Sequence, residues 1–422
     1  MGNGVSMSAP RENPAPRTKT RSGWRPPRLG VDIWLIIVVF TLLVFGLLMV
    51  YSASTDYSMV VLGEAPTYMF RRQLVFALGG ILVAAFLTLF DYHRFKNLAV
   101  LIIAVTIIGL AGVLIVNEVI NNAARTLFRG SIQPSEFAKL AIVIYLAVWL
   151  FARKEQLSSV SFGLLPLSII LGVIGGLILL QPDLSATLTI FIIGGIMFFL
   201  AGGDLRQIVL FLVVGTVVGW VVFTFHPTGS QRLSEYVVSI QDLTQAPLHL
   251  SRSLEALVKG SWFGVGIGRA ETKLTGLPVP PTDSIFAVIG EEIGIVGSTI
   301  VVLLNVILLW RGIKIAQVAP DGLGRLLAAG LSIWLATEAF INMAVIVGLV
   351  PFAGNALPFI SYGGSNLFVS LAAVGILLNI SRVSARSQEK EERSLDAFID
   401  LRRRDRRWGV SSARRTKGAA GR

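Results

Sequence analysis

The 422-residue sequence contains no cysteine and only three histidines, His93, His226 and His249, which are far apart. The absence of cysteine excludes disulfides, thiolate metal ligands and thiol nucleophiles together. The histidines do not have the spacing of metal ligands. Chemistry in this chain must therefore depend on carboxylates, hydroxyls, amides and basic side chains.

Charged residues are also scarce: they make up 15% of the chain, against 54% hydrophobic residues, and the mean hydropathy is +0.72. Such a composition is typical of membrane proteins. The apolar runs are too long and too continuous for the alternating strands of a membrane barrel. The sequence therefore predicts an all-α polytopic membrane protein.

Apolar runs long enough to cross a bilayer, about 20 residues each, recur ten times. They lie near residues 31–53, 72–90, 97–117, 135–152, 161–180, 184–201, 207–225, 284–310, 325–350 and 360–381. The longest predicted connection is the loop 226–283, in which Leu250, Leu254 and Leu257 recur at helical spacing. A connection of this length in a compact protein is usually functional or disordered, and the helical spacing favours order.

The net charge of +12 arises mainly at the two ends of the chain and in short loops. Most Lys and Arg residues lie in segments on the same predicted side as the N-terminus, which places both termini in the cytoplasm. These basic residues indicate topology, so a nucleic-acid partner is not expected. We predict a disordered basic cytoplasmic tail (1–30), a ten-helix membrane domain (31–382) and a charged cytoplasmic tail (383–422).

Several ionisable side chains fall inside the predicted spans, where they are energetically costly. Glu136 and Lys139 share a face of the fourth span and can form an ion pair. Asp183 lies between the fifth and sixth spans, and Glu338 and Asn342 share a face of the ninth. Each residue alone could serve helix packing. Together they predict a polar cavity inside the bundle.

A Thr282-Asp283 pair follows Pro280-Pro281 at the predicted start of the eighth span, on the outer side of the membrane. One interpretation is that Thr282 or Asp283 caps this helix and that the carboxylate favours its positive end. The other is that the proline-rich approach holds the Asp283 carboxylate at the membrane surface as a general base. The local sequence leaves both interpretations open.

Four of the arginines on the same predicted outer side are candidates for anion binding: Arg125, Arg129, Arg232 and Arg252. Arginine binds phosphate oxygens through two parallel hydrogen bonds, so these residues could hold a pyrophosphate. They could equally contact the lipid head groups.

Six motifs occur in order along the chain: NNAAR at 121–125, IQPSEFAKL at 132–140, QPDLS at 181–185, GVGIG at 264–268, TDSIFAVIGEE at 282–292 and LPFISYGGS at 357–365. Together they resemble the SEDS family (shape, elongation, division and sporulation), from about Asp32 to Arg382. The resemblance implies ten spans, cytoplasmic termini, and an inverting glycosyltransferase that polymerises the lipid-linked precursor lipid II outside the cytoplasmic membrane.

The resemblance also implies roles for single residues. Asp283 matches the essential acid of the family, which favours catalysis over capping. Four further residues match positions that the family keeps for substrate binding or internal pairing. These four are Arg125, Glu136, Lys139 and Asp183. Arg232 and Ser361 complete the set of candidate substrate-binding residues.

The start Asp32-Ile33-Trp34 and the long basic N-terminal segment resemble the division member of the family more than the elongation member. The expected partners are lipid II, the growing glycan-lipid, a class B penicillin-binding transpeptidase and other division proteins. A divalent cation, Mg²⁺ or Mn²⁺, would be held mainly by the substrate pyrophosphate. The alternatives are an elongation-type polymerase, a lipid II flippase and a scaffold without chemistry.

The chain departs from the family pattern at a few positions. Val279 and Pro281 stand where Glu and His are usual before the Thr-Asp pair. Thr126 replaces a Trp, and Asn366 stands where a Ser is common. The first change removes a possible second acid beside Asp283, so a mechanism with two carboxylates in this loop is not expected.

Overall fold

The computed structural model describes residues 30–116, 132–225, 227–242 and 245–415. Within these ranges the chain folds into α-helices joined by loops, two short 3₁₀ turns and one π turn. The α-helices are α1 (Ile33–Val60), α2 (Tyr68–Leu89), α3 (Phe95–Val116), α4 (Pro134–Ala152), α5 (Leu165–Leu179), α6 (Leu184–Leu200), α7 (Leu205–Phe225), α8 (Pro227–Gln241), α9 (Leu248–Gly260), α10 (Ile285–Val318), α11 (Gly322–Ile346) and α12 (Gly364–Arg415).

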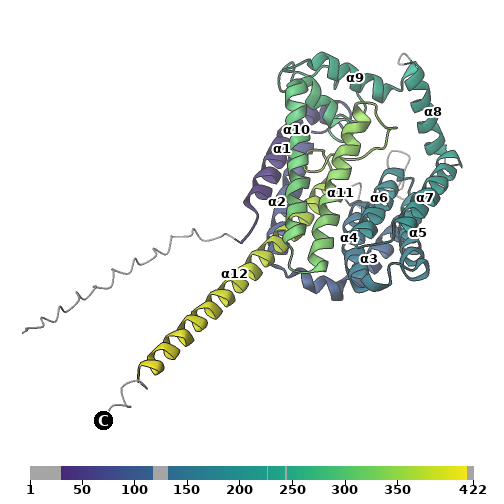
Figure 1. The fold of residues 1–422 in the computed structure, drawn as a ribbon. Helices are drawn as coiled ribbons and strands as arrows, with labels where there is room; N and C mark the ends of the chain where they lie inside the picture. The colour runs from purple at the N-terminus through teal and green to yellow at the C-terminus, as the bar shows by residue number, and fades with distance from the viewer. Residues whose placement is uncertain (1–29, 117–131, 226, 243–244, 416–422) are drawn as a thin grey trace, which may run out of the picture.

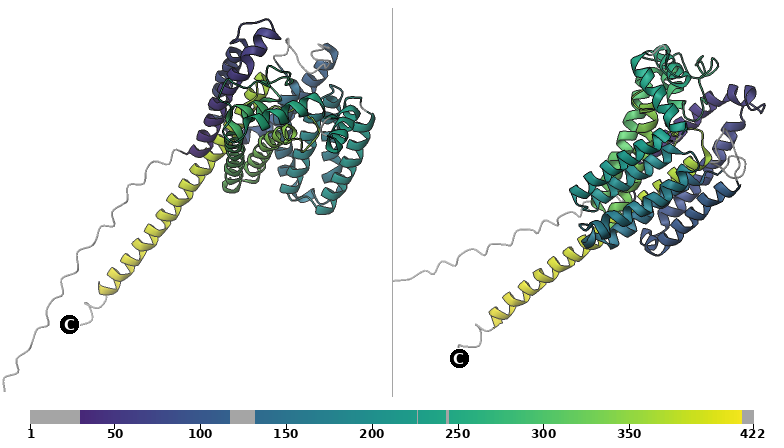
Figure 2. Two further views of the ribbon diagram at one scale, coloured as in Figure 1. Left: turned by 90° about the horizontal axis from the view of Figure 1, so that it is seen from above. Right: turned by 90° about the vertical axis from the view of Figure 1, so that its right-hand side faces the viewer.

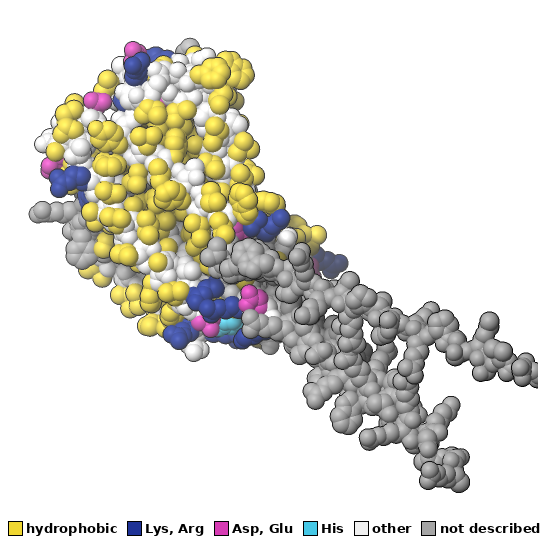
Figure 3. Space-filling model, turned by 90° about the vertical axis from the view of Figure 1, so that its left-hand side faces the viewer, with side chains coloured by type: hydrophobic (Ala, Val, Ile, Leu, Met, Phe, Trp, Pro, Cys, Tyr) yellow, Lys and Arg dark blue, Asp and Glu magenta, His cyan; other side chains and the backbone are white. Residues whose placement is uncertain are grey.

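Eight helical segments in the described residues are long and apolar enough to cross a membrane, and α6 and α7 add two shorter apolar stretches. Each of the ten predicted spans overlaps one of these helices. In the view of Figure 3, apolar side chains cover the middle of the molecule and charged side chains gather at its two ends. The prediction of an all-α polytopic membrane protein is confirmed, whereas the exact number of crossings stays a prediction.

The centre of the bundle is formed by α4, α11 and the first half of α12, in which most residues are buried. α12 packs along α2, α10 along α11, and α3 along α4 (Figures 1 and 2). Polar residues on the central helices therefore face other helices instead of lipid.

The described residues of the connection between α7 and α10 lie at one end of the bundle, at the top of Figure 1. It contains α8 and α9, and α9 packs against α10. The predicted helix around Leu250, Leu254 and Leu257 is confirmed, because α9 includes all three. We call this end of the molecule the α8–α9 end.

At the opposite end, α12 leaves the bundle and continues to Arg415 (Figures 1 and 2). The predicted span ended at residue 381, well before the helix does. The predicted boundary between membrane domain and tail, at residues 382–383, therefore falls within a continuous helix, and the cytoplasmic location of this tail stays a prediction.

Helix α10 is interrupted at Gly294, whose backbone adopts φ +76°. The glycine-rich loop after α9 pairs with the backbone groups freed at this break. Val265 N donates to Glu291 O at 3.0 Å, and Ile295 N donates to Ser261 O at 2.9 Å. Such pairing is necessary because unsatisfied backbone groups are costly in a buried setting. It fixes the fourth motif to the first turns of α10, directly after Asp283.

We predict that Gly294→Ala destabilises the protein by about 1–3 kcal/mol, because its Cβ must overlap a neighbouring backbone. That Cβ would lie 2.5 Å from Trp262 O, at a φ that disfavours side chains. The control is Gly215→Ala in α7, where a Cβ meets nothing within 4 Å. Thermal unfolding in detergent compares the two variants, and equal melting temperatures would contradict the assigned role of the break.

Candidate functional site

The segment 357–366, which follows the loop after α11 and includes the first residues of α12, brings several motifs together at the α8–α9 end. Ser361 Oγ donates to Thr282 O at 2.7 Å, which joins the last motif to the Thr-Asp motif. Gln133 N donates to Ser365 Oγ at 3.0 Å, which joins it to the start of α4. Motifs that are far apart in the sequence therefore form one continuous polar site.

The Thr-Asp pair does not occupy the cap position of α10. This helix begins at Ile285, its N-cap residue is Ser284, and the Ser284 side chain makes no capping hydrogen bond. The Thr282 hydroxyl donates to Val279 O at 3.3 Å. The capping interpretation placed the cap at Thr282 or Asp283 and is wrong about its position.

The backbone at Asp283 is fixed by three hydrogen bonds from outside its own segment. The consecutive carbonyls of residues 281–283 accept, in order, from Tyr362 N at 2.8 Å, Ser361 Oγ at 2.7 Å and Asn342 Nδ2 at 2.9 Å. The prolines before this pair restrict the backbone further. The position of Asp283 is thus determined by α11 and by the segment 357–366.

The half-buried Asp283 carboxylate lies against the loop that follows α11. A Cβ placed on Gly354 would stand 3.4 Å from Asp283 Oδ2. Two residues earlier in this loop, the Arg232 guanidinium lies over the Phe352 ring, with its central carbon 5.1 Å from the ring centroid. Arg232 Nη1 also donates to Phe352 O at 3.3 Å. The loop therefore brings a cation of α8 and the candidate carboxylate to the same region.

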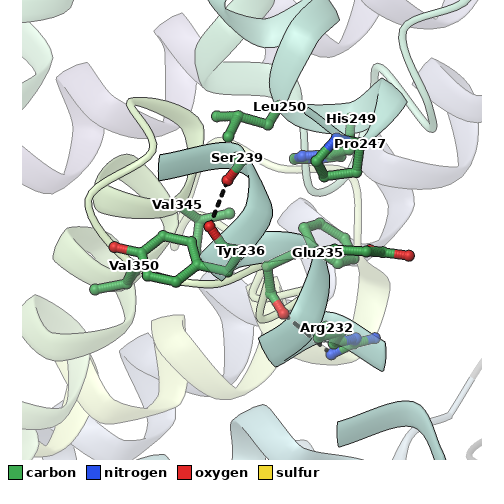
Figure 4. A pocket seen from close by; sticks show the side chains of 10 residues that line it. Arg232, Glu235, Tyr236, Ser239, Pro247, His249, Leu250, Val345 and Val350 are labelled. Atoms are coloured by element: carbon green, nitrogen blue, oxygen red, sulfur yellow. Dashed lines mark hydrogen bonds between the residues drawn. The ribbon is translucent and has the colours of Figure 1, made fainter. Parts of the chain in front are cut away.

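A cavity of about 70 Å³ opens between α8, α9 and the end of α11 (Figure 4). This volume has room for several water molecules. Its polar lining comes from Arg232, Glu235, Tyr236, Ser239 and His249. Apolar residues of α9, α11 and the loop after α11 line the remaining wall. Burial, with a smaller contribution from the charge of Arg232, lowers the pKa of His249 to about 4, so this ring is neutral at ordinary pH.

A buried ion cluster lies beneath this site, between α4, α11 and α12. The Lys139 ammonium contacts Glu136 Oε2 at 2.7 Å and also pairs with Glu338. Asn366 Nδ2 donates to Glu136 Oε2 at 2.9 Å and approaches Glu338 at 3.5 Å. The Lys139 side chain is 5% exposed. Of the two roles left open for Glu136 and Lys139, their contacts are those of internal pairing.

Asp183 joins the starts of α4 and α6. Its carboxylate accepts from Ala186 N at 3.2 Å, as the cap of α6, and from Ser185 Oγ at 3.0 Å. It also accepts from Ser135 Oγ at 3.0 Å and from Gln133 Nε2 at 3.2 Å. These contacts anchor two helices at the α8–α9 end.

The structure therefore divides the candidate residues into two groups. The first group is the Thr-Asp motif with Asp283, Ser361, which bonds this motif, and Arg232, which lies on the loop that borders it. The second group, formed by Glu136, Lys139 and Asp183, holds helices together below or beside the motif. Arg125 lies in the segment 117–131, outside the described residues. No three His, Asp or Glu side chains gather at a possible metal site in the described part of the chain.

Sequence reasoning missed two amides and one imidazole in this region. Gln73 of α2 donates to Ser361 O at 3.1 Å and accepts from Gly363 N at 3.2 Å. A polar side chain inside an apolar span was the available signal. Asn366 stands where a Ser is common in the family, but the sequence indicated no role for it. The signal for His249 was that the chain contains only three histidines.

These features define the class of the molecule: a polytopic α-helical membrane protein whose loops converge on a carboxylate at one end of the bundle. Residues 33–386 match the family described as cell cycle protein, which comprises FtsW, RodA and SpoVE. The chain belongs to this family, and the resemblance of the six motifs is confirmed.

Relatives and solved structures match over nearly their whole length. The chain is 38% identical to a probable peptidoglycan glycosyltransferase FtsW of Trichlorobacter lovleyi, over 85% of this chain and 95% of that protein. It is 37% identical to the stage V sporulation protein E of Bacillus subtilis, over 84% and 97%.

The fold matches a chain of a peptidoglycan synthase complex with a TM-score of 0.69 and 26% identity, over 84% of this chain and 99% of that chain. It also matches the rod shape determining protein RodA of Thermus thermophilus with a TM-score of 0.63 and 26% identity, over 85% and 98%.

We predict that Lys139→Met destabilises the protein by about 3–5 kcal/mol, because it leaves two buried carboxylates without their cation. Thermal unfolding in detergent measures the loss. Adding Glu338→Gln should restore part of the stability, since one of the two orphaned charges is then removed. Lys314→Met, at an exposed position of α10, is the control. A Lys139→Met variant as stable as this control would rule out the ion cluster as a structural requirement.

Proposed function

We propose that this protein is a peptidoglycan glycosyltransferase that joins disaccharide units of lipid II into glycan strands, with Asp283 as its catalytic residue. Family membership and the names of the relatives support the activity. The observation that carries the assignment of Asp283 is the set of three hydrogen bonds that fix its backbone from α11 and the segment 357–366. A base held this rigidly is suited to catalysis by position.

In the proposed reaction, an Asp283 carboxylate oxygen takes the proton of the 4-hydroxyl of the acceptor N-acetylglucosamine. The hydroxyl oxygen attacks the anomeric carbon of the donor N-acetylmuramic acid, and the bond to the lipid pyrophosphate breaks. The configuration at that carbon inverts. Because pyrophosphate leaves as an anion, this reaction needs no second carboxyl group as a general acid, unlike hydrolysis of a glycoside.

The leaving pyrophosphate requires positive charge. Arg232 supports this role, because its guanidinium lies on the loop that borders Asp283. Arg125 is a second candidate from the first motif, whereas Lys139 is already engaged by two carboxylates. We assign a divalent cation, Mg²⁺ or Mn²⁺, mainly to the substrate phosphates, whose oxygens are the ligands that these ions prefer.

The proposed location is the cytoplasmic membrane, with both termini inside and Asp283 on the outer face. The distribution of basic residues supports this orientation. The FtsW name of several relatives favours septal synthesis during division over an elongation role. The match to a chain of a synthase complex supports a class B penicillin-binding transpeptidase as partner. Complementation of cells depleted of either the division or the elongation member discriminates the two roles.

We predict that Asp283→Asn abolishes polymerisation of purified lipid II, with a loss of about 10²- to 10⁴-fold if a positioned base is removed. The control is Glu271→Gln, which neutralises an exposed carboxylate of the same loop and should retain activity. Gel analysis of glycan products is the measurement. Polymer from the Asn variant at the normal rate would refute the assignment of Asp283. A chain that only transports lipid II would yield no polymer in either form.

A further inference from the structure

One hydroxyl group joins the two ends of the proline-rich turn around Asp283. Ser284 Oγ donates to Pro278 O at 2.6 Å, so the first residue of the turn is bonded to the residue that follows Asp283. The turn between them contains two prolines, which offer no N–H donors to stabilise it. Within the turn, Thr282 N and Thr282 Oγ1 donate to Val279 O, and the Ser284 hydroxyl adds the bond that joins its ends.

His249 of α9 is the second partner of this hydroxyl. Its Nε2 lies 3.0 Å from Ser284 Oγ. A serine hydroxyl has a single proton, and here the shorter contact to Pro278 O takes it. Ser284 Oγ must then accept from His249, which requires the proton of the imidazole to be on Nε2. The opposite tautomer would compete for the serine proton and release Pro278 O.

The surroundings of His249 favour a neutral ring. The half-buried ring packs against Phe352, with ring centroids 4.2 Å apart. The charged residues that line the same cavity are Arg232 and Glu235, both on α8, and the wall formed by α11 and the loop after it is apolar (Figure 4). Burial and the Arg232 charge disfavour the imidazolium, so the ring keeps one proton for Ser284.

We propose that His249 is a positioning residue for Asp283, acting through the Ser284 hydroxyl by donating from Nε2. Three contacts from α11 and the segment 357–366 fix the carbonyls of residues 281–283, and His249 adds a further constraint from the α9 side. The inference rests on the proposed role of Asp283. It assigns α9 a function in orienting the carboxylate, beyond covering the end of the bundle.

The first test compares His249→Leu with His249→Gln in the lipid II polymerisation assay. Gln retains an N–H donor at about the reach of Nε2, whereas Leu retains only bulk. We expect kcat to fall about 10- to 100-fold in the Leu variant, with KM for lipid II changed less than twofold, and to recover to within about threefold in the Gln variant. A residue that only packs against Phe352 would show no such difference, and equal kcat values for Leu and Gln would overturn the proposal.

The second test is a double-mutant cycle with Ser284→Ala. Because both residues act through one contact, Ser284→Ala should reproduce the kcat loss, and His249→Leu with Ser284→Ala should lose no more than either single variant. Multiplied losses would show that the two residues act separately and would contradict the proposal.

The third test needs no variant at position 249. The chain has only three histidines, so ¹⁵N-histidine labelling gives a simple spectrum, which His93→Gln and His226→Gln assign. We expect His249 to stay neutral with its proton on Nε2 from pH 5 to pH 8. A neutral ring with its proton on Nδ1 in this range would refute the mechanism, because Nε2 could then only accept. Full activity of Asp283→Asn would instead refute the proposed function, whatever the state of His249.

Discussion

The structure depends on one constraint: polar groups that lie between the helices must find partners inside the protein. The segment 357–366 supplies several of these partners at the α8–α9 end. Its Ser361 holds the Thr-Asp motif, its Ser365 holds the start of α4, and Asn366 bonds the buried carboxylate of Glu136. Since these contacts reach across α4, α10 and α12, the same bonds that assemble the bundle also position Asp283.

The buried charges and the candidate catalytic carboxylate have different tasks in this arrangement. Lys139 lies between two carboxylates and is almost inaccessible, which suits a structural role and leaves it poorly placed to contact a substrate. Asp283 is half-buried, and its position is set through backbone carbonyls. The contacts of these carbonyls therefore determine where the side chain lies. The break in α10 also helps to position Asp283, because the glycine-rich motif is attached there, in the turns of α10 that follow Asp283.

Much of the fold could be predicted from the sequence, because the length of the hydrophobic runs and the distribution of charge determine the membrane helices directly. The helical spacing of Leu250, Leu254 and Leu257 identified α9, and the pairing of Glu136 with Lys139 followed from their spacing. The cap of α10 was placed one or two residues too early, because local sequence alone does not show that a hydrogen-bonded turn intervenes. Contacts such as Gln73 of α2 with Ser361 join segments that are far apart in the sequence and have no local signature. The break at Gly294 likewise depends on a loop thirty residues away in the sequence.

The proposed mechanism requires the carboxylate of Asp283 to reach a hydroxyl group of the acceptor sugar. The most direct test is the structure of the Asp283→Asn variant with a bound acceptor disaccharide. We expect the side chain of residue 283 to lie about 3 Å from the 4-hydroxyl of N-acetylglucosamine, directly or through one water molecule. A bound acceptor whose 4-hydroxyl is separated from this side chain by other protein groups would contradict the account.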